Sequence, residues 1–147
     1  MNKVVLDSCV FSKLFLQEAD RQEALELITE LSQQNVQVLV PSLFLYEVLS
    51  IAAASPFPMG KVHTLIIQYQ SANLKTVELD EETILKAIDI CAYGHEKSGF
   101  PSFYDASYHA LAIINECQFI TADKRHIAKT KAFGYVTLLN DWKGIFK

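Results

Sequence analysis

Short apolar runs alternate with longer stretches of helical periodicity along the whole chain, and this alternation restricts the fold more than any other feature. Strands are predicted for Val4–Leu6, Val36–Val40, Leu74–Leu79, Gln118–Ala122 and Tyr135–Leu139. Helices are predicted for Cys9–Leu16, Arg21–Gln34, Leu43–Ala54, Lys61–Gln70, Glu81–Tyr93, Ser102 to about Glu116, and Lys124–Ala132. Such alternation is typical of α/β proteins, so we predict a mostly parallel sheet of about five strands flanked by helices on both faces.

Composition narrows the class of protein further. A chain of 147 residues that is half hydrophobic is expected to form one domain over residues 1–147. The formal net charge of −4 argues against a nonspecific nucleic-acid coat, but not against an enzyme with a local basic patch. The three cysteines have neither zinc-like nor disulfide-like spacing, which favours reduced thiols in the cytoplasm. No signal peptide and no membrane-spanning run is evident.

Isolated acids stand where apolar segments should carry no charge. Asp7 and Asp123 each follow a predicted strand, and Glu47 interrupts the apolar stretch Leu43–Leu49. Asp105 lies near the start of another predicted helix. Carboxylates are almost never buried without a partner, because desolvating an unpaired charge costs several kcal/mol. Ligands of parallel sheets bind beyond the carboxyl ends of the strands, so these acids are expected to converge on one crevice around a divalent cation.

The local contexts of these acids, taken in order, resemble a known family. The matching stretches are Val4–Val10, Pro41–Leu43 with Tyr46–Leu49, Tyr104–Ala112, and Phe119–Lys124. The chain resembles a PIN-domain nuclease, and more narrowly the VapC-type toxins of bacterial toxin–antitoxin pairs, from residue 3 to about 140. Each motif is short, and the specificity lies in the order of all four.

The resemblance implies the roles of particular residues. Asp7, Glu47, Asp105 and Asp123 are implied to be the catalytic acids that bind Mg²⁺ or Mn²⁺, with Thr121 supporting the site. The family often has a serine two residues after its first aspartate, where this chain has Cys9, so the metal preference is open. Ser8 is placed with Thr121 as a supporting residue, although on an unchanged backbone it would point elsewhere.

The resemblance also implies an activity and partners. It implies an endoribonuclease that acts on tRNA or rRNA, a cognate antitoxin that blocks the site, a homodimer, and a cytoplasmic location. Carboxylates are hard ligands suited to Mg²⁺ and Mn²⁺, and a bound cation can activate water and neutralise charge on a phosphodiester. The residues themselves fit metal-dependent hydrolysis, and the preference for RNA rests on the resemblance.

Each acid also has a structural interpretation. Asp7 and Asp123 could cap the helices that follow them, and Asp105 could be a first-turn acid in a helix capped by Ser102. Glu47 is the hardest to explain without a ligand.

Other residues carry weaker signals. His109 follows Asp105 by one helical turn, and we interpret it as a buried, hydrogen-bonded histidine; His63, His95 and His126 are interpreted as surface residues. Cys9 is interpreted as a small core residue.

Basic and aromatic residues beside the acids suggest contacts with RNA. Lys124 and Arg125 are candidates for phosphate contacts, with a solvated helix face as the equal alternative. Tyr104 and Tyr108 flank Asp105 and are suited to stack on unpaired bases, but the favoured interpretation is that at least one of them packs in the core.

Two rival functions remain open. A haloacid-dehalogenase-type phosphatase also begins with an aspartate at a strand end, but it needs a second aspartate where this chain has Cys9. A degenerate PIN domain could serve as an RNA- or protein-binding module, although the presence of all four acids weighs against it. A purely structural subunit would leave Glu47 without an explanation.

Overall fold

The apolar runs form a five-stranded parallel sheet in the computed structural model, which describes residues 1–147. The strands are β1 (Lys3–Leu6), β2 (Gln37–Pro41), β3 (Leu74–Val77), β4 (Gln118–Thr121) and β5 (Val136–Leu138). Their order across the sheet is β3-β2-β1-β4-β5, and every neighbouring pair is parallel. The predicted α/β class and strand number are confirmed.

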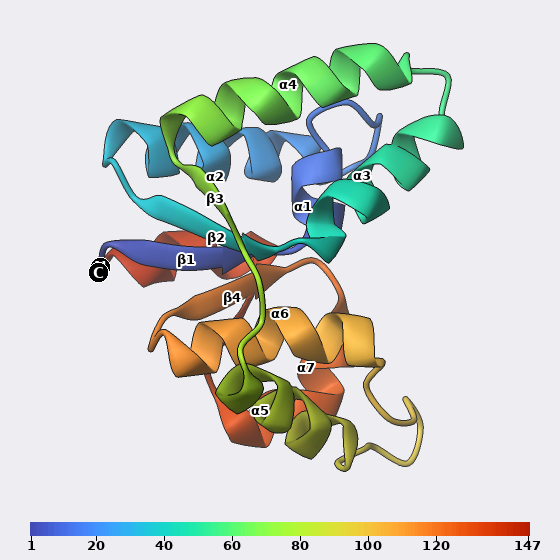
Figure 1. The fold of residues 1–147 in the computed structure, drawn as a ribbon, viewed down its shortest axis with the longest axis vertical. Coiled ribbons are helices and arrows are strands. Elements are labelled where there is room, and N and C mark those ends of the chain that lie inside the picture. Colours follow the sequence, from blue (N-terminus) through green and yellow to red (C-terminus); the bar gives the residue numbers. More distant parts are fainter.

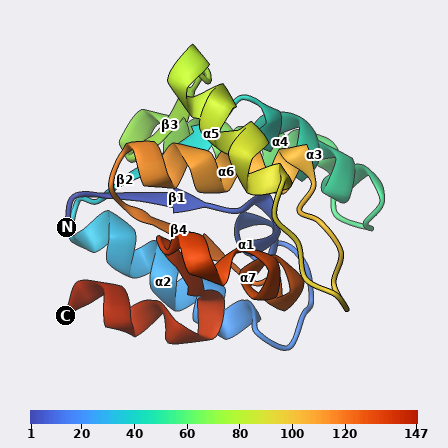
Figure 2. The ribbon, with the colours of Figure 1, turned by 90° about the horizontal axis from the view of Figure 1, so that it is seen from below.

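Helices cover both faces of this sheet. They are α1 (Ser8–Ser12), α2 (Arg21–Gln33), α3 (Leu43–Ala53), α4 (Met59–Ala72), α5 (Glu81–Cys91), α6 (Phe103–Ile114) and α7 (Lys124–Thr130), with 3₁₀ segments at Lys131–Phe133 and Leu139–Phe146. Figure 1 shows α2, α3 and α4 at one end of the molecule and α5, α6 and α7 at the other. Figure 2 shows the sheet between α5 and α6 on one side and α2 and the C-terminal 3₁₀ segment on the other. No helix has the length and apolar character needed to cross a membrane.

The central strands are buried on both faces, as expected for a parallel sheet with helices on each side. Val4 and Val5 of β1 and Phe119 and Ile120 of β4 are fully inaccessible to solvent. The packing of these strands therefore fixes the positions of the residues that directly follow their carboxyl ends.

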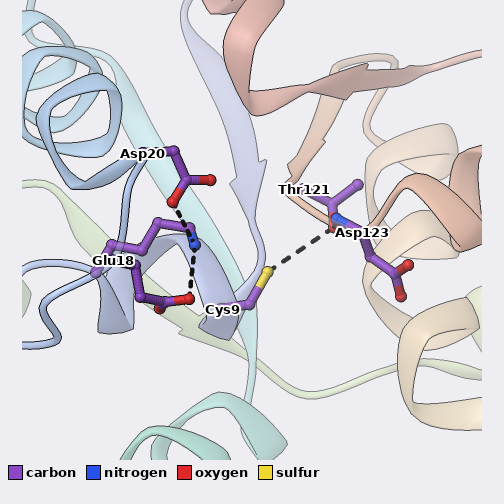
Figure 3. Close-up of polar contacts among 6 residues, drawn as sticks. Cys9, Glu18, Asp20, Thr121 and Asp123 are labelled. Carbon is purple, nitrogen blue, oxygen red and sulfur yellow. Dashed lines mark hydrogen bonds and ion pairs between the residues drawn. The ribbon is translucent and has the colours of Figure 1, made fainter.

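The predicted helix Cys9–Leu16 is too long, and the residue that follows the observed helix is a buried lysine. Helix α1 ends at Ser12, and Lys13 follows with only 5% of its surface exposed. Its Nζ lies 2.8 Å from Asp20 Oδ1 and 3.4 Å from Glu18 Oε2 (Figure 3). A buried ammonium group needs such partners, and both acids lie in the loop that leads to α2.

The C-terminal 3₁₀ segment was not predicted from the sequence. It is held by a tertiary contact, in which the buried Trp142 indole donates a hydrogen bond to Glu23 Oε2 at 2.7 Å. No local pattern in the sequence predicts a contact between residues this far apart in the chain.

The order of the strands places one crevice at the centre of the sheet. From β1 the chain moves to β2 and β3 on one side, and β4 and β5 lie on the other side. The carboxyl ends of β1 and β4 therefore flank the switch point at which α/β sheets bind ligands. Asp7 directly follows β1, and Asp123 follows β4 by two residues.

Candidate active site

Asp7 is a buried carboxylate fixed at the switch point. Its backbone N–H donates to Ile120 O at 3.0 Å, which extends the pairing of β1 with β4 by one residue. Its side chain is 6% exposed, and its Oδ2 accepts a hydrogen bond from the Thr121 hydroxyl at 2.7 Å. Asp7 occupies the N-cap position of α1, but its side chain makes no capping hydrogen bond to that helix. The carboxylate instead bonds to Thr121 at the end of β4.

Thr121 connects the segments that carry two of the acids. It is fully buried at the end of β4, donates to Asp7, and accepts the backbone N–H of Asp123 at 3.0 Å. The Cys9 sulfur lies 4.0 Å from the Thr121 oxygen, and Figure 3 shows these two side chains facing each other. Burial raises the pKa of the Cys9 thiol, so the side chain stays protonated. This agrees with the interpretation of Cys9 as a small packing residue rather than a nucleophile.

Glu47 enters the same region from α3 and is held by two hydroxyl groups. Tyr108 of α6 donates to Glu47 Oε1 at 2.6 Å, and Ser8 donates to the same oxygen at 3.2 Å. The Ser8 hydroxyl is also 3.4 Å from Asp7 Oδ1, so it lies between the two carboxylates. The expectation that Ser8 points elsewhere is wrong, because the first residue of α1 turns its side chain toward α3.

Asp105 approaches from the first turn of α6. The Ser102 hydroxyl caps this helix by accepting the Asp105 backbone N–H at 3.1 Å, which confirms the predicted helix start. Burial, followed by the charges of Asp7 and Asp123, raises the pKa of Asp105 to about 6. Glu47 raises the same pKa by a smaller amount, so all four acids share one electrostatic environment.

Asp123 has a structural role that the sequence anticipated. Its Oδ1 accepts the backbone N–H groups of Arg125 and His126 at 2.9 and 3.2 Å, so it caps α7. The other oxygen, Oδ2, accepts no hydrogen bond from the protein. Lys124 and Arg125 are exposed at the start of α7, directly beyond this acid.

No cationic side chain neutralises any of the four acids. The ion pairs of the structure join Lys13 to Glu18 and Asp20, and Lys86 to Asp89. Burial accordingly raises the pKa of Asp7 and of Glu47. Hard oxygen donors that are half-buried or buried without a countercharge fit a divalent cation. In this conformation, however, no three His, Cys, Asp or Glu side chains lie close enough together to hold a metal ion.

Two histidines form a buried pair beneath α7. His109 Nδ1 and His126 Nε2 are 3.1 Å apart, and His109 Nε2 is 2.7 Å from Gly134 O. The expectation for His109 is confirmed, but the interpretation of His126 as a surface residue is wrong, because it is 1% exposed. Burial and the neighbouring His109 lower the pKa of His126 to about 4.

An open cleft of about 640 Å³ borders the acids. It is lined by Ser8, Ser42, Leu43, Tyr46, Glu47, Ser50, Ile51 and Tyr104. Ser8 and Glu47 connect it to the crevice at β1 and β4, whereas Asp7, Asp105 and Asp123 do not line it.

The two tyrosines of α6 have separate roles. Tyr108 is fully buried and stacks on Phe119, with ring centroids 5.8 Å apart, so it is the one that packs in the core. Tyr104 is 63% exposed at the cleft. Tyr46, which is 69% exposed and also lines the cleft, was not predicted from the sequence. Its signal was present, because Phe44, Val48 and Ala52 form the buried stripe of α3 and Tyr46 lies on the opposite face.

Comparison with known proteins identifies the fold and the family. The fold is similar to those of several solved structures. VapBC2 from Rickettsia felis, bound to a promoter DNA fragment, has a TM-score of 0.67 at 13% identity, covering 92% of this chain and 96% of the other. VapC20 from Mycobacterium tuberculosis, a toxin that cleaves the sarcin–ricin loop, has a TM-score of 0.66 at 15% identity, and the match covers 90% of this chain and 96% of VapC20. FitAcB from Neisseria gonorrhoeae has a TM-score of 0.63 at 15% identity, and the match covers 95% of this chain and 98% of the other.

The sequence gives the family directly. No protein of curated function matches it significantly. Residues 4–132, which include all four acids and both central strands, match the profile of the PIN domain. The chain therefore belongs to the PIN domain family.

Proposed function

We propose that this protein is a metal-dependent endoribonuclease, the toxin of a toxin–antitoxin pair. Asp7 carries the proposal, because it is a buried carboxylate at the switch point of the sheet with no cationic partner. Membership of the PIN family and a fold shared with VapC20, which cleaves the sarcin–ricin loop, support the same class of reaction. Family membership also argues against the haloacid-dehalogenase-type phosphatase.

The four acids have distinct tasks in this proposal. Asp7, Glu47, Asp105 and Asp123 would hold Mg²⁺ or Mn²⁺, and their oxygens provide the hard donor set that these ions prefer. When bound, the cation lowers the pKa of water and neutralises charge on the phosphodiester. Thr121 and Ser8 orient Asp7 and Glu47 by donating hydrogen bonds to their oxygens. The crowding of the acids favours cation binding, because the charges of Asp7, Asp123 and Glu47 add to the effect of burial in raising the pKa of Asp105.

RNA and two protein partners complete the proposal. Lys124 and Arg125 are exposed beside Asp123 and are suited to contact RNA phosphates. The substrate is proposed to be a tRNA or rRNA. Because the fold is similar to that of a toxin–antitoxin complex from Klebsiella pneumoniae, a cognate antitoxin is proposed to block the acids. The toxin itself is proposed to act as a cytoplasmic homodimer.

A non-catalytic binding module is the second candidate. It is favoured by one observation, the lack of three potential ligands close enough to hold a metal in this conformation. In this account the four acids would lack a common ligand, and RNA or protein binding would not depend on Mg²⁺ or Mn²⁺.

Cleavage of RNA separates the two candidates. Purified protein is incubated with total tRNA and rRNA, with Mg²⁺, with Mn²⁺ or with a chelator. We expect discrete products that require the cation. If RNA is bound but remains intact under every condition, the binding module is the better account.

Removal of the Tyr108 hydroxyl tests the support of Glu47. The Tyr108→Phe variant keeps the ring that stacks on Phe119 and loses the 2.6 Å bond to Glu47. Loss of a group that orients a metal ligand typically reduces metal affinity or activity about 10- to 100-fold, and we expect that loss in the Mn²⁺ dependence of cleavage. Titration of cleavage with Mn²⁺ measures it.

The matched control is Tyr93→Phe, which removes an exposed hydroxyl that does not bond to any of the four acids. It should behave as wild type. A Tyr108→Phe variant with an unchanged Mn²⁺ dependence would show that the hydroxyl has no part in positioning Glu47.

A further inference from the structure

We infer that the cleft lined by Tyr46 and Tyr104 binds an unpaired nucleobase of the RNA by stacking. This inference rests on the proposed function and adds to it a specific subsite. It assigns the two exposed rings to substrate binding and predicts that the enzyme acts where a base can leave its helix.

The placement of the two tyrosines is the first step. Each immediately precedes a proposed catalytic acid, Tyr46 before Glu47 on α3 and Tyr104 before Asp105 on α6. Although they lie on separate helices, both rings line the same cleft. A base held there would lie next to the Glu47 carboxylate, which is one of the acids proposed to act on the neighbouring phosphodiester.

The exposure of the rings is the second step. Tyr46 is 69% exposed and Tyr104 is 63% exposed, whereas Tyr108, on the same helix as Tyr104, is fully buried. The rings of Tyr46 and Tyr104 therefore contribute little to the hydrophobic core. Aromatic side chains exposed beside a nucleic-acid site stack on unpaired bases, because every base has an apolar π face.

The remaining lining of the cleft fits a base better than an apolar peptide. Three serine hydroxyls, from Ser8, Ser42 and Ser50, lie along the same cleft with the Glu47 carboxylate. A nucleobase combines apolar faces with a polar edge, so it can use the rings and the hydroxyls together. A helix that docks through an apolar face would desolvate the hydroxyls of Ser42 and Ser50 without offering them partners.

Single-stranded hexamers with and without bases test the inference. The probes are fluorescein-labelled RNA homohexamers of each of the four bases, and a hexamer in which stable abasic residues replace all bases. Binding to the full chain is measured by fluorescence anisotropy in Ca²⁺, with the integrity of each probe checked on a gel. We expect wild type to bind at least one base-bearing hexamer about 5- to 150-fold more tightly than the abasic hexamer.

Paired substitutions assign the preference to the rings. The Tyr46→Leu and Tyr104→Leu variants should each lose most of the preference for base-bearing over abasic hexamers. The Tyr46→Phe and Tyr104→Phe variants should keep this preference because the ring remains. Tyr93→Leu replaces an exposed tyrosine that does not line the cleft and should keep it as well. Circular dichroism confirms that each variant is folded.

The outcomes separate this inference from the nuclease proposal. A base preference that depends on the two rings, without cleavage of any RNA, supports the inference and contradicts the nuclease. Equal binding of base-bearing and abasic hexamers, or no binding of either, overturns the inference even if the protein cleaves RNA. Leucine variants that retain the preference overturn it too, and would assign the rings to a surface for a protein partner.

Discussion

The Asp7→Asn variant is expected to lose RNA cleavage by about 10²- to 10⁴-fold and to be more stable than wild type in the absence of divalent cations. Asn has the same shape and keeps an oxygen that can accept the 2.7 Å bond from Thr121. It removes a buried negative charge that has no cationic partner. The free energy of unfolding should therefore rise by about 1–3 kcal/mol. Cleavage assays and chemical denaturation with a chelator present measure the two effects.

Opposite changes in activity and stability distinguish a functional acid from a structural one. Asp89→Asn is the matched control, because Asp89 is an exposed acid whose only ion pair is with Lys86. It should change neither quantity appreciably, since exposed ion pairs contribute little. An Asp7→Asn protein that cleaves RNA as well as wild type, or that is destabilised, would contradict the role assigned to Asp7.

The Asp105→Asn variant is expected to gain stability relative to wild type as the pH rises from about 4 to above 6. The pKa of Asp105 is raised from 3.8 to about 6, so the folded protein favours the protonated carboxyl. Below pH 3.8 the group is protonated in both states and wild type keeps this contribution in full. As the pH rises through 6 the contribution is lost, at most about 3 kcal/mol for a shift of this size.

The difference between the two proteins isolates Asp105 from other titrating groups. His126 has the opposite effect in wild type, because its pKa is lowered to about 4 and its neutral form is favoured in the folded state. Its contribution is the same in both proteins and cancels. Chemical denaturation at pH 3.5, 5 and 7 measures the difference in the free energy of unfolding between the Asp105→Asn variant and wild type. Saturating Mn²⁺ at pH 7 should stabilise wild type more than the variant. A difference that does not change between pH 3.5 and 7 would show that the pKa of Asp105 is not raised in the folded protein.

The sequence predicted the sheet well because the signals for buried parallel strands are local. The five strands and most helices were predicted from apolar runs and from capping residues such as Ser102, which accepts the Asp105 N–H at 3.1 Å. The errors lie where distant contacts decide. Lys13, the residue that follows α1, forms ion pairs with the next loop, and Trp142 holds the C-terminal segment against α2.

The acids of the site could be named from the sequence, but their partners could not. Asp7 and Glu47 were recognisable because charge is rare in apolar segments. The Tyr108–Glu47 bond, the position of Ser8 between two carboxylates and the burial of His126 all depend on how α1, α3, α6 and α7 meet. No periodicity within one segment contains that information.

Direct binding of Mn²⁺ tests the central claim, that these four acids form a cation site. Isothermal titration calorimetry is made on wild type and on the Asp7→Asn, Asp105→Asn and Asp89→Asn variants. The account predicts saturable binding of about one or two ions to wild type and to Asp89→Asn, and an affinity at least about 10-fold weaker in the other two variants. Absence of saturable binding to wild type, or equal affinity in all four proteins, would contradict it.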